Sequence, residues 1–403
     1  MSDSRWQPPR LHTELKGHEE RKVTWLELFY DLVYVATIIQ LGNTLSDDVS
    51  PLGFIKFVTL FVLIWWSWTG ITFYINRFVV DDVWHRVLIF IQILPITIVG
   101  VSVEGAFGEL ASQFALAYVG IRGVLVLLYL RAWKHVETAR PLISRYMAGF
   151  SLAAFIWLIS AFVPTPWNYM LWGLGMFVDF GTPLLPRTRA LQSLLRPDVE
   201  HMSERYGLLT IIVLGEGFVK TIGSASGQHI TLSAFIFSIF GLSLAYSLWW
   251  IYFDDVAGAE VNLVGRAPYV WIYSHLPVTI ALTAFGVAIK KLYLLPPVEL
   301  LPDKYRWLFC VAVMLYLIFV ALIDLVTVRE DQTLDSKTRA RFRFASAAFV
   351  LLLAILGTQL TPLLFMILMV VGCVGPIIIE LNMARKNVAI SPKPFTAEVG
   401  SRE

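Results

Sequence analysis

Apolar stretches of about twenty residues alternate with short polar connections along almost the whole chain. An α-helix needs about 20 mostly apolar residues to cross the hydrocarbon core of a bilayer. The pattern therefore predicts an all-α integral membrane protein with about twelve transmembrane helices. They lie near residues 25–43, 52–76, 85–105, 112–132, 146–163, 167–186, 206–223, 230–253, 268–290, 305–327, 342–359 and 362–383.

Two of the predicted connections are very short and contain proline. Pro164-Thr165-Pro166 separates the fifth and sixth segments, and Gln359-Leu360-Thr361-Pro362 separates the last two. Proline ends or kinks a helix because it lacks an N–H group and clashes with the preceding turn. We therefore expect a tight helical hairpin at both places, since one merged helix of about 40 residues would be too long for a single bilayer.

Composition agrees with a lipid environment. The 403-residue chain is 57% hydrophobic and 15% charged, whereas soluble globular chains carry about 25% charged residues. The net charge of +2 provides no basic field for nucleic acid, so the expected partner is the lipid bilayer. The two cysteines, Cys310 and Cys373, lie in apolar runs and predict neither a disulfide framework nor a metal site.

The Lys and Arg residues predict the orientation in the membrane. Most of them lie in the N-terminal tail, in the even-numbered connections and in the C-terminal tail. Because cytoplasmic segments are enriched in these residues, we expect the two tails, 1–24 and 384–403, to be cytoplasmic. Residues 1–24 are polar and do not resemble a signal peptide.

Short matches between the two halves of the chain indicate an internal repeat. Leu94-Pro95-Ile96-Thr97-Ile98 in the third segment corresponds to Leu276-Pro277-Val278-Thr279-Ile280 in the ninth. A Trp pair lies in both the second and the eighth segment. We therefore predict two six-helix repeats, 25–186 and 206–383, joined by a cytoplasmic linker at 187–205. An even number of spans gives both repeats the same orientation, as in some transporters.

Pro95 and Pro277 occupy matching positions inside the predicted third and ninth helices. Each leaves a carbonyl group one turn earlier without its helical hydrogen bond, and a neighbouring helix, water or a hydroxyl group must satisfy it. Thr97 and Thr279 follow two residues later and are candidates for that role. Two interpretations stay open: a structural kink, or a broken helix that lines a polar cavity.

Ionisable residues inside a membrane span are costly and therefore indicate function. Glu27 and Asp31 lie four residues apart in the first segment, so they share one helix face. Two carboxylates at this spacing repel each other, and either a bridging cation or a bound proton relieves the repulsion. This makes them candidates for proton or ion coupling. Alternatively, both lie at the cytoplasmic surface and pair with Arg21, Lys22 or the basic loops.

Glu216 lies near the centre of the seventh segment, between Gly215 and Gly217. The two glycines permit another helix to approach closely. Lys220 follows four residues later, a spacing that favours an ion pair within the helix. We expect this carboxylate to be a further proton- or ion-coupling candidate, with Arg122 of the fourth segment as its most natural counter-charge.

Four other residues are weaker candidates. Glu104 and Asp179 lie near segment ends, where they would extend to the membrane surface or face water. Asp324 lies near the cytoplasmic end of the tenth segment. His275, just before a helical proline, is more typical of a hydrogen-bonded packing residue than of a ligand.

Two stretches resemble a known family. Residues 20–35 (ERKVTWLELFYDLVYV) and residues 204–216 (ERYGLLTIIVLGE) are similar to the two signatures of the bacterial low temperature requirement protein A (LtrA) family. Asn76-Arg77-Phe78, followed by Asp81-Asp82, also fits the family pattern. The resemblance covers about residues 18–385.

The resemblance implies a bacterial, multi-pass plasma-membrane protein that is linked to growth at low temperature, and it implies no reaction. The two signatures contain Glu27, Asp31 and Glu216, which are the residues chosen above on electrostatic grounds. The chain departs from the family at Gly217, where we expect a serine, so it offers no hydroxyl group at that position.

These observations leave three functions in competition. We expect a proton- or cation-linked secondary transporter or permeation pathway for a small solute or ion, with Glu27, Asp31, Glu216 and Arg122 along a polar cavity between the halves. The alternative is a membrane-embedded sensor or scaffold for low-temperature adaptation. An intramembrane enzyme is less favoured, because the sequence contains no H-E-x-x-H, G-x-S-x-G or phosphate-loop motif. We therefore predict no catalytic residue, cofactor or metal ligand, and leave the solute and the oligomeric state open.

Overall fold

The computed structural model describes residues 6–14, 22–225, 232–262, 264–296, 299–329 and 334–390. The helices of the N-terminal half are α1 (Trp25–Asp47), α2 (Pro51–Arg77), α3 (Val83–Ser102), α4 (Ala111–His135), α5 (Arg140–Ser160), α6 (Trp167–Leu184) and α7 (Pro186–Leu194). Those of the C-terminal half are α8 (Val199–Ala225), α9 (Leu232–Phe253), α10 (Ala267–Tyr293), α11 (Asp303–Leu325), α12 (Ser336–Leu356) and α13 (Pro362–Ile390). Short 3-10 turns cover His12–Glu14, Glu137–Ala139 and Gly357–Gln359.

The predicted apolar segments coincide with the longer helices, α1–α6 and α8–α13. Within the described residues, ten of these helices are long and apolar enough to cross a membrane by length and composition. Both predicted hairpins are present, because α5 ends at Ser160 before α6 begins at Trp167, and α12 ends at Leu356 before α13 begins at Pro362. The prediction of an all-α membrane protein is therefore confirmed.

Local sequence signals set several helix starts. The side chains of Thr24, Ser50, Asp82 and Asp335 accept hydrogen bonds from backbone N–H groups in the first turns of α1, α2, α3 and α12. These caps satisfy N–H groups that have no partner within the helix. Proline occupies one of the first two positions of α2, α5, α7 and α10, where the missing N–H group is not needed.

The predicted linker at 187–205 is mostly helical. It contains most of α7, and α8 begins at Val199, seven residues before the predicted start of the seventh segment. The first turns of α8 are rich in charged residues, so hydropathy placed the helix start too late. Consequently His201 and Arg205 lie on a helix that packs against α1 and α2.

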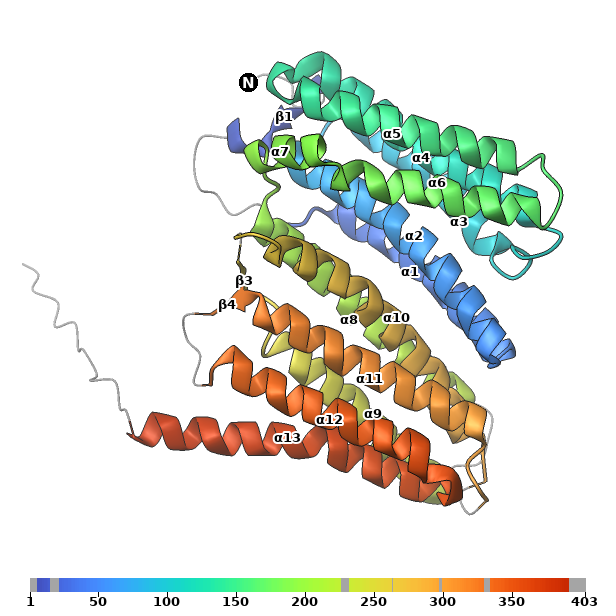
Figure 1. The fold of residues 1–403 in the computed structure, drawn as a ribbon, viewed down its shortest axis with the longest axis vertical. Helices are drawn as coiled ribbons and strands as arrows, with labels where there is room; N and C mark the ends of the chain where they lie inside the picture. The colour runs from blue at the N-terminus through green and yellow to red at the C-terminus, as the bar shows by residue number, and fades with distance from the viewer. Residues whose placement is uncertain are drawn as a thin grey trace, which may run out of the picture.

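The helices form two groups, which Figure 1 shows as α1–α7 above and α8–α13 below. The groups meet where α1 and α2 pack against α8 and α10. Of the ten candidate spans, α10 is the most enclosed: 78% of its most apolar stretch is buried, against 33% for α5. The contact between the halves is therefore built around α10 and the first two helices.

Two short antiparallel strand pairs lie at the same end of the helices as α7 (Figure 1). They join β1 (Arg10–Leu11) to β2 (Phe78–Val79), and β3 (Glu260–Val261) to β4 (Thr327–Val328). Large apolar side chains such as Phe162, Phe177 and Leu356 are exposed on the outside. In a membrane protein, an outer surface of this kind faces lipid.

Candidate functional site

A buried group of charges joins α1 to α8, and we call it the interface charge cluster. It consists of Glu27 and Asp31 from α1 and His201 and Arg205 from α8, each at most 3% exposed. The Arg205 guanidinium forms an ion pair with Asp31, and its Nη1 lies 3.6 Å from Glu27 Oε2. His201 Nε2 lies 3.2 Å from the same Glu27 oxygen. The cluster thus connects the first and second halves of the protein through charge.

This geometry gives Glu27 and Asp31 a cation that they share, and their role in proton or ion coupling stays a prediction. Their shared cation is Arg205, which the sequence analysis assigned to the linker 187–205. This contact agrees with the interpretation that the two carboxylates pair with a basic connection, because the linker 187–205 is one of those connections. Arg21 lies outside the described residues. The Arg205 guanidinium faces both carboxylates, so it relieves the repulsion between them.

Polar neighbours hold the interface charge cluster in place. The Trp68 indole N–H donates to Asp31 Oδ1 at 2.7 Å, and the Thr24 hydroxyl donates to Glu27 Oε1 at 3.0 Å. Asn76 Nδ2 lies 3.0 Å from His201 Nδ1.

A second buried ion pair lies in the N-terminal half. Arg122 Nη2 of α4 lies 2.6 Å from Asp179 Oδ2 of α6, and both side chains are fully buried. Arg122 Nη2 also donates to the Tyr118 hydroxyl at 2.8 Å. The prediction that Arg122 is the counter-charge of Glu216 is therefore wrong. The prediction that Asp179 extends to the membrane surface or faces water is also wrong, because its side chain is buried and pairs with Arg122.

Glu216 lies on α8 but at a different level from the interface charge cluster. It follows Arg205 by eleven residues, which places it roughly 16 Å further along the helix axis. It is 7% exposed, and its neighbour Gly217 packs against Gly286 of α10. The predicted close approach of another helix is therefore confirmed. The predicted pair with Lys220 falls on a side chain outside the described ones.

Pro95 and Pro277 lie inside α3 and α10, and both helices continue through them. The interpretation of a broken helix is therefore wrong. Pro95 fits against the bare backbone of Gly120 in α4. The hydroxyl groups of Thr97 and Thr279 bond to the carbonyls of Ile93 and of His275 and Leu276, not to those freed by the prolines.

His275 has the role that its setting predicted, because both ring nitrogens have partners inside the protein. Nε2 lies 2.9 Å from the Tyr252 hydroxyl, and Nδ1 lies 2.7 Å from the Trp271 carbonyl oxygen. The ring is fully buried. It is therefore a hydrogen-bonded packing residue.

Another charge cluster lies in the C-terminal half, and of its members only Asp324 stood out in the sequence as a weaker candidate. Arg339 forms a two-pronged pair with Asp324, with contacts of 2.6 and 3.1 Å. Arg343 pairs with Asp255 and, at 3.1 Å, with Glu380. Burial raises the pKa of the Asp255 carboxyl above its ordinary value of 3.8, while the guanidiniums of Arg343 and Arg339 act in the opposite direction. In the sequence, Arg339 and Arg343 served only as part of the positive bias that predicts the orientation in the membrane.

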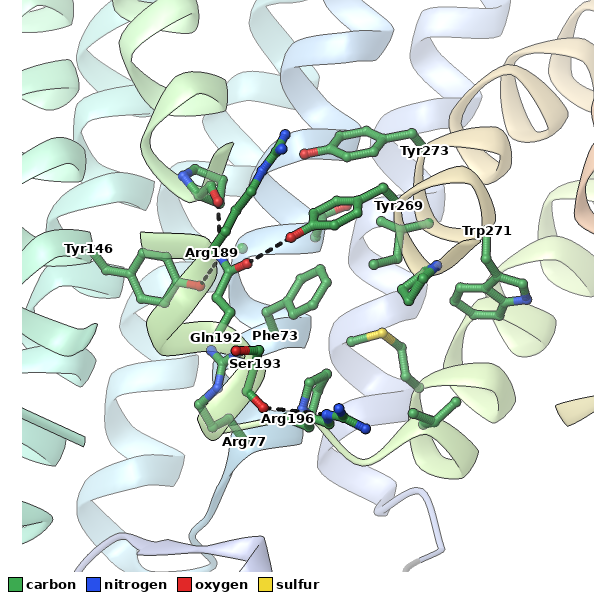
Figure 2. Close-up of a pocket in the computed structure, with 18 of the residues that line it drawn as sticks. Phe73, Arg77, Tyr146, Arg189, Gln192, Ser193, Arg196, Tyr269, Trp271 and Tyr273 are labelled. Atoms are coloured by element: carbon green, nitrogen blue, oxygen red, sulfur yellow. Dashed lines mark hydrogen bonds between the residues drawn. The ribbon is translucent and has the colours of Figure 1, made fainter. Parts of the chain in front are cut away.

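A cavity of about 240 Å³ lies between the two halves, and we call it the inter-half cavity (Figure 2). Its wall comes from α2, α4, α5, α6 and α7 of the N-terminal half and from α8 and α10 of the C-terminal half. Arg122 lies in this wall, whereas Glu27, Asp31 and Glu216 are not among the described residues that line it. Lining residues Val199 and Met202 are neighbours of His201 on α8, so the cavity and the interface charge cluster share this helix.

Arginine and aromatic side chains dominate the cavity wall. Figure 2 shows Arg77, Arg189 and Arg196 around it, with Tyr146 on one side and residues of α10 on the other. Gln192 ties these walls together, because its amide donates to the Tyr146 hydroxyl at 2.8 Å and its oxygen accepts from Tyr269 at 3.4 Å. Neither the sequence signatures nor hydropathy indicates which residues line this cavity, since they come from seven helices.

No metal site appears among the described residues, where no three His, Cys, Asp or Glu side chains are arranged to hold an ion. Cys310 and Cys373 are free and buried. The described groups thus offer buried charge pairs between helices and a cavity that both halves line.

Comparisons with known proteins agree with the resemblance noted in the sequence. The sequence model of a family described as bacterial low temperature requirement A protein (LtrA) matches residues 22–377. The chain is also similar to the uncharacterized protein RA0937 of Rhizobium meliloti (strain 1021). The two are 27% identical over 285 residues, which is 66% of this chain and 69% of the relative.

Proposed function

The chain belongs to the bacterial low temperature requirement A family, and from that premise we propose that it is a proton-linked secondary transporter of the bacterial plasma membrane, and not an enzyme. The observation that carries the proposal is the inter-half cavity, whose walls belong to both halves. The interface charge cluster joins the same two halves. A relative movement of the halves would open the cavity to one side of the membrane and then to the other.

The proposal includes twelve spans in two parallel repeats. Helices α6 and α8 complete the count beyond the ten candidate spans. Contacts of α3 with α4, α4 with α5 and α5 with α6 have counterparts in α10 with α11, α11 with α12 and α12 with α13. The contact of α1 with α3 likewise has a counterpart in α8 with α10. This shared packing order supports a duplicated six-helix unit, related by an axis along the membrane normal.

We place both termini, and the mouth of the inter-half cavity, on the cytoplasmic side. Arg77, Arg131 and Arg205 lie at or near the same helix ends as the exposed Arg189 and Arg196. Positive side chains gather at the cytoplasmic ends of membrane helices. The distribution therefore supports this orientation.

The proposed proton link concerns the two carboxylates of the interface charge cluster. Glu27 and Asp31 both lie against the Arg205 guanidinium, and a proton on either carboxyl group would weaken its attraction to that guanidinium. A change in this buried charge pairing would favour a different separation of α1 and α8. Glu216, at another level of α8, remains a second candidate for the same role.

Distances between spin labels in liposomes test alternating access without knowledge of the solute. One pair, at Leu194 and Val264, reports on the cavity end, and another, at Leu52 and Leu294, reports on the opposite end. All four side chains are at least half exposed, and Cys310 and Cys373 are first replaced by alanine. We expect the two distances to change in opposite directions between pH 5 and pH 8.

The variant Asp31→Asn should remove or displace this pH response, because it changes the charge of the interface charge cluster. Asp81→Asn is the matched control, since Asp81 forms an ion pair that is mostly exposed. Distances that stay fixed at both ends over the whole pH range would contradict alternating access. A response that is identical in Asp31→Asn and the parent would contradict the assigned proton site.

A further inference from the structure

The inter-half cavity has an unbalanced positive charge. Four arginines line it, Arg77, Arg122, Arg189 and Arg196, and no Asp or Glu is among the described residues in its wall. Asp179 forms an ion pair with Arg122 but is not among the residues that line the cavity. The other three arginines form no ion pair with any described carboxylate. A cavity with this charge excludes cations and attracts anions.

Arg77 is the strongest single indication of an anionic ligand. It is 2% exposed, and its Nε donates to the Leu195 carbonyl oxygen at 3.0 Å. Its Nη1 atom is buried and has no hydrogen-bond partner among the described residues. A buried guanidinium without a carboxylate is costly, and a bound anion would remove that cost. The planar guanidinium suits carboxylate and phosphate oxygens, which it binds with two parallel hydrogen bonds.

The remaining wall is rich in aromatic rings. Trp66 stacks on Phe180 at 3.8 Å between ring centroids, and on Tyr273 at 6.1 Å. The Arg189 guanidinium lies over the Tyr269 ring at 5.0 Å. Stacked rings present flat apolar faces that a planar organic group can pack against. The volume of about 240 Å³ lies below the range of roughly 300–1,000 Å³ for drug-sized ligands, so the ligand is small.

From these observations we propose that the inter-half cavity binds a small organic anion, a carboxylate or phosphate monoester joined to a planar apolar body. This inference rests on the proposed transport function, for which it names the class of cargo. Arg189 and Arg196 are exposed at the mouth and attract the anion, and Arg77 binds it inside. The planar body lies against Tyr269, Trp271 and Tyr273. An anionic lipid headgroup has the same chemistry and is a second source of the anion.

Binding to the full chain in nanodiscs of phosphatidylcholine tests the proposal. The probes are phenyl phosphate, inorganic phosphate, phenol and the cation tyramine, titrated by calorimetry. We expect phenyl phosphate to bind most tightly, because it alone offers both the anion and the ring. Tyramine should not bind measurably. Equal affinity for phenyl phosphate and tyramine would overturn the proposal.

Arginine variants locate the binding site. Arg77→Gln should weaken phenyl phosphate binding by about 10-fold or more, since it removes charge-assisted hydrogen bonds, and should leave phenol binding unchanged. Arg86→Gln is the matched control, because Arg86 lies far outside the wall in an exposed pair. Arg196→Gln changes an exposed side chain whose Nε donates only a local hydrogen bond, to the Ser193 carbonyl oxygen at 3.4 Å, and it should weaken binding even if Arg77→Gln fails to fold. Unchanged affinity in Arg196→Gln and in any folded Arg77→Gln would overturn the proposal.

Flux measurements separate this inference from the proposed function. Uptake of phenyl phosphate into liposomes, together with its binding, supports both. Binding without uptake supports the anion site and contradicts transport. Uptake of tyramine without binding of phenyl phosphate supports transport and overturns the assigned ligand class.

A second set of nanodiscs identifies the source of the anion. Phosphatidylglycerol replaces part of the phosphatidylcholine, and native mass spectrometry counts the lipids that the protein retains. If phosphatidylglycerol is retained, is lost in Arg196→Gln and blocks phenyl phosphate, the anion site is supported and the headgroup is its ligand. If phenyl phosphate binds equally in both lipids, the site is supported for a free organic anion.

Discussion

Removal of Arg205 should expose how strongly the two halves depend on the interface charge cluster. In the variant Arg205→Met, Glu27 and Asp31 keep their burial but lose their shared cation. Removing one partner of a buried, hydrogen-bonded ion pair costs about 3–5 kcal/mol. Arg205 is fully buried and contacts both carboxylates, so we expect a loss within that range.

The free energy of unfolding, measured in lipid bicelles by steric trapping, gives this loss directly. The matched control is Arg86→Met, because the Arg86–Asp81 pair has side chains that are 61% and 66% exposed. An exposed pair of this kind contributes about 0–1 kcal/mol. The difference between the two variants therefore isolates the effect of burial.

A triple variant completes the test. Glu27→Gln, Asp31→Asn and Arg205→Met together remove the two carboxylates and the guanidinium of the interface charge cluster. The triple variant then buries no carboxylate without its cation, which is the source of the cost, so it should regain most of the loss. A cost of less than about 1 kcal/mol for Arg205→Met, or a triple variant as unstable as Arg205→Met, would refute the reasoning.

Three further predictions concern other parts of the fold and use the same measurement of unfolding. Asp179→Asn should destabilise the protein by about 3 kcal/mol, and adding Arg122→Gln should cost less than the sum of the two single changes. Hydrogen bonds from Thr338 hold the pKa of the Asp335 carboxyl below its ordinary value of 3.8. This stabilisation is complete above pH 3.8 and is lost as the pH falls further, so the deficit of Asp335→Ala at pH 7 should shrink below that value. Gly286→Ala places a Cβ atom 2.9 Å from Gly217 Cα and should cost about 1–3 kcal/mol, whereas Gly215→Ala, with open space around it, should not.

Hydropathy predicted the helices well because a bilayer allows few alternatives. Backbone groups in lipid must bond within the segment, so a long apolar run is helical. Pro164, Pro166 and Pro362 marked the helix ends, because proline lacks the N–H group that would continue the helical hydrogen bonds. The start of α8 was missed because residues 199–205 are polar and read as a connection. The helix continues there because Glu27, Asp31 and Asn76 supply partners for His201 and Arg205.

The candidate site was predictable only in part. Glu27 and Asp31 stood out because carboxylates in an apolar run need an explanation. Their partner lies 174 positions away from Asp31, and no local spacing indicates contacts over such a distance. Arg122 was correctly expected to need a carboxylate, but the choice between Glu216 and Asp179 depends on which helices pack together. Helix packing was not visible in the apolar pattern.

Arginine residues have two roles in this protein that sequence counting cannot separate. Arg77, Arg205, Arg339 and Arg343 all contribute to the positive bias that predicts orientation, yet each is at most 6% exposed in the structure. Three of them bind buried carboxylates, whereas Arg77 faces the inter-half cavity without one among the described residues. If Arg77 served only to fix the orientation of the protein in the membrane, its side chain would extend to the membrane surface, as is typical of an arginine at a helix end. Its burial against the Leu195 carbonyl and the cavity wall instead requires a ligand or a structural purpose. The titration of Arg77→Gln with phenyl phosphate distinguishes these two, because a structural arginine would change stability and leave anion affinity unaltered.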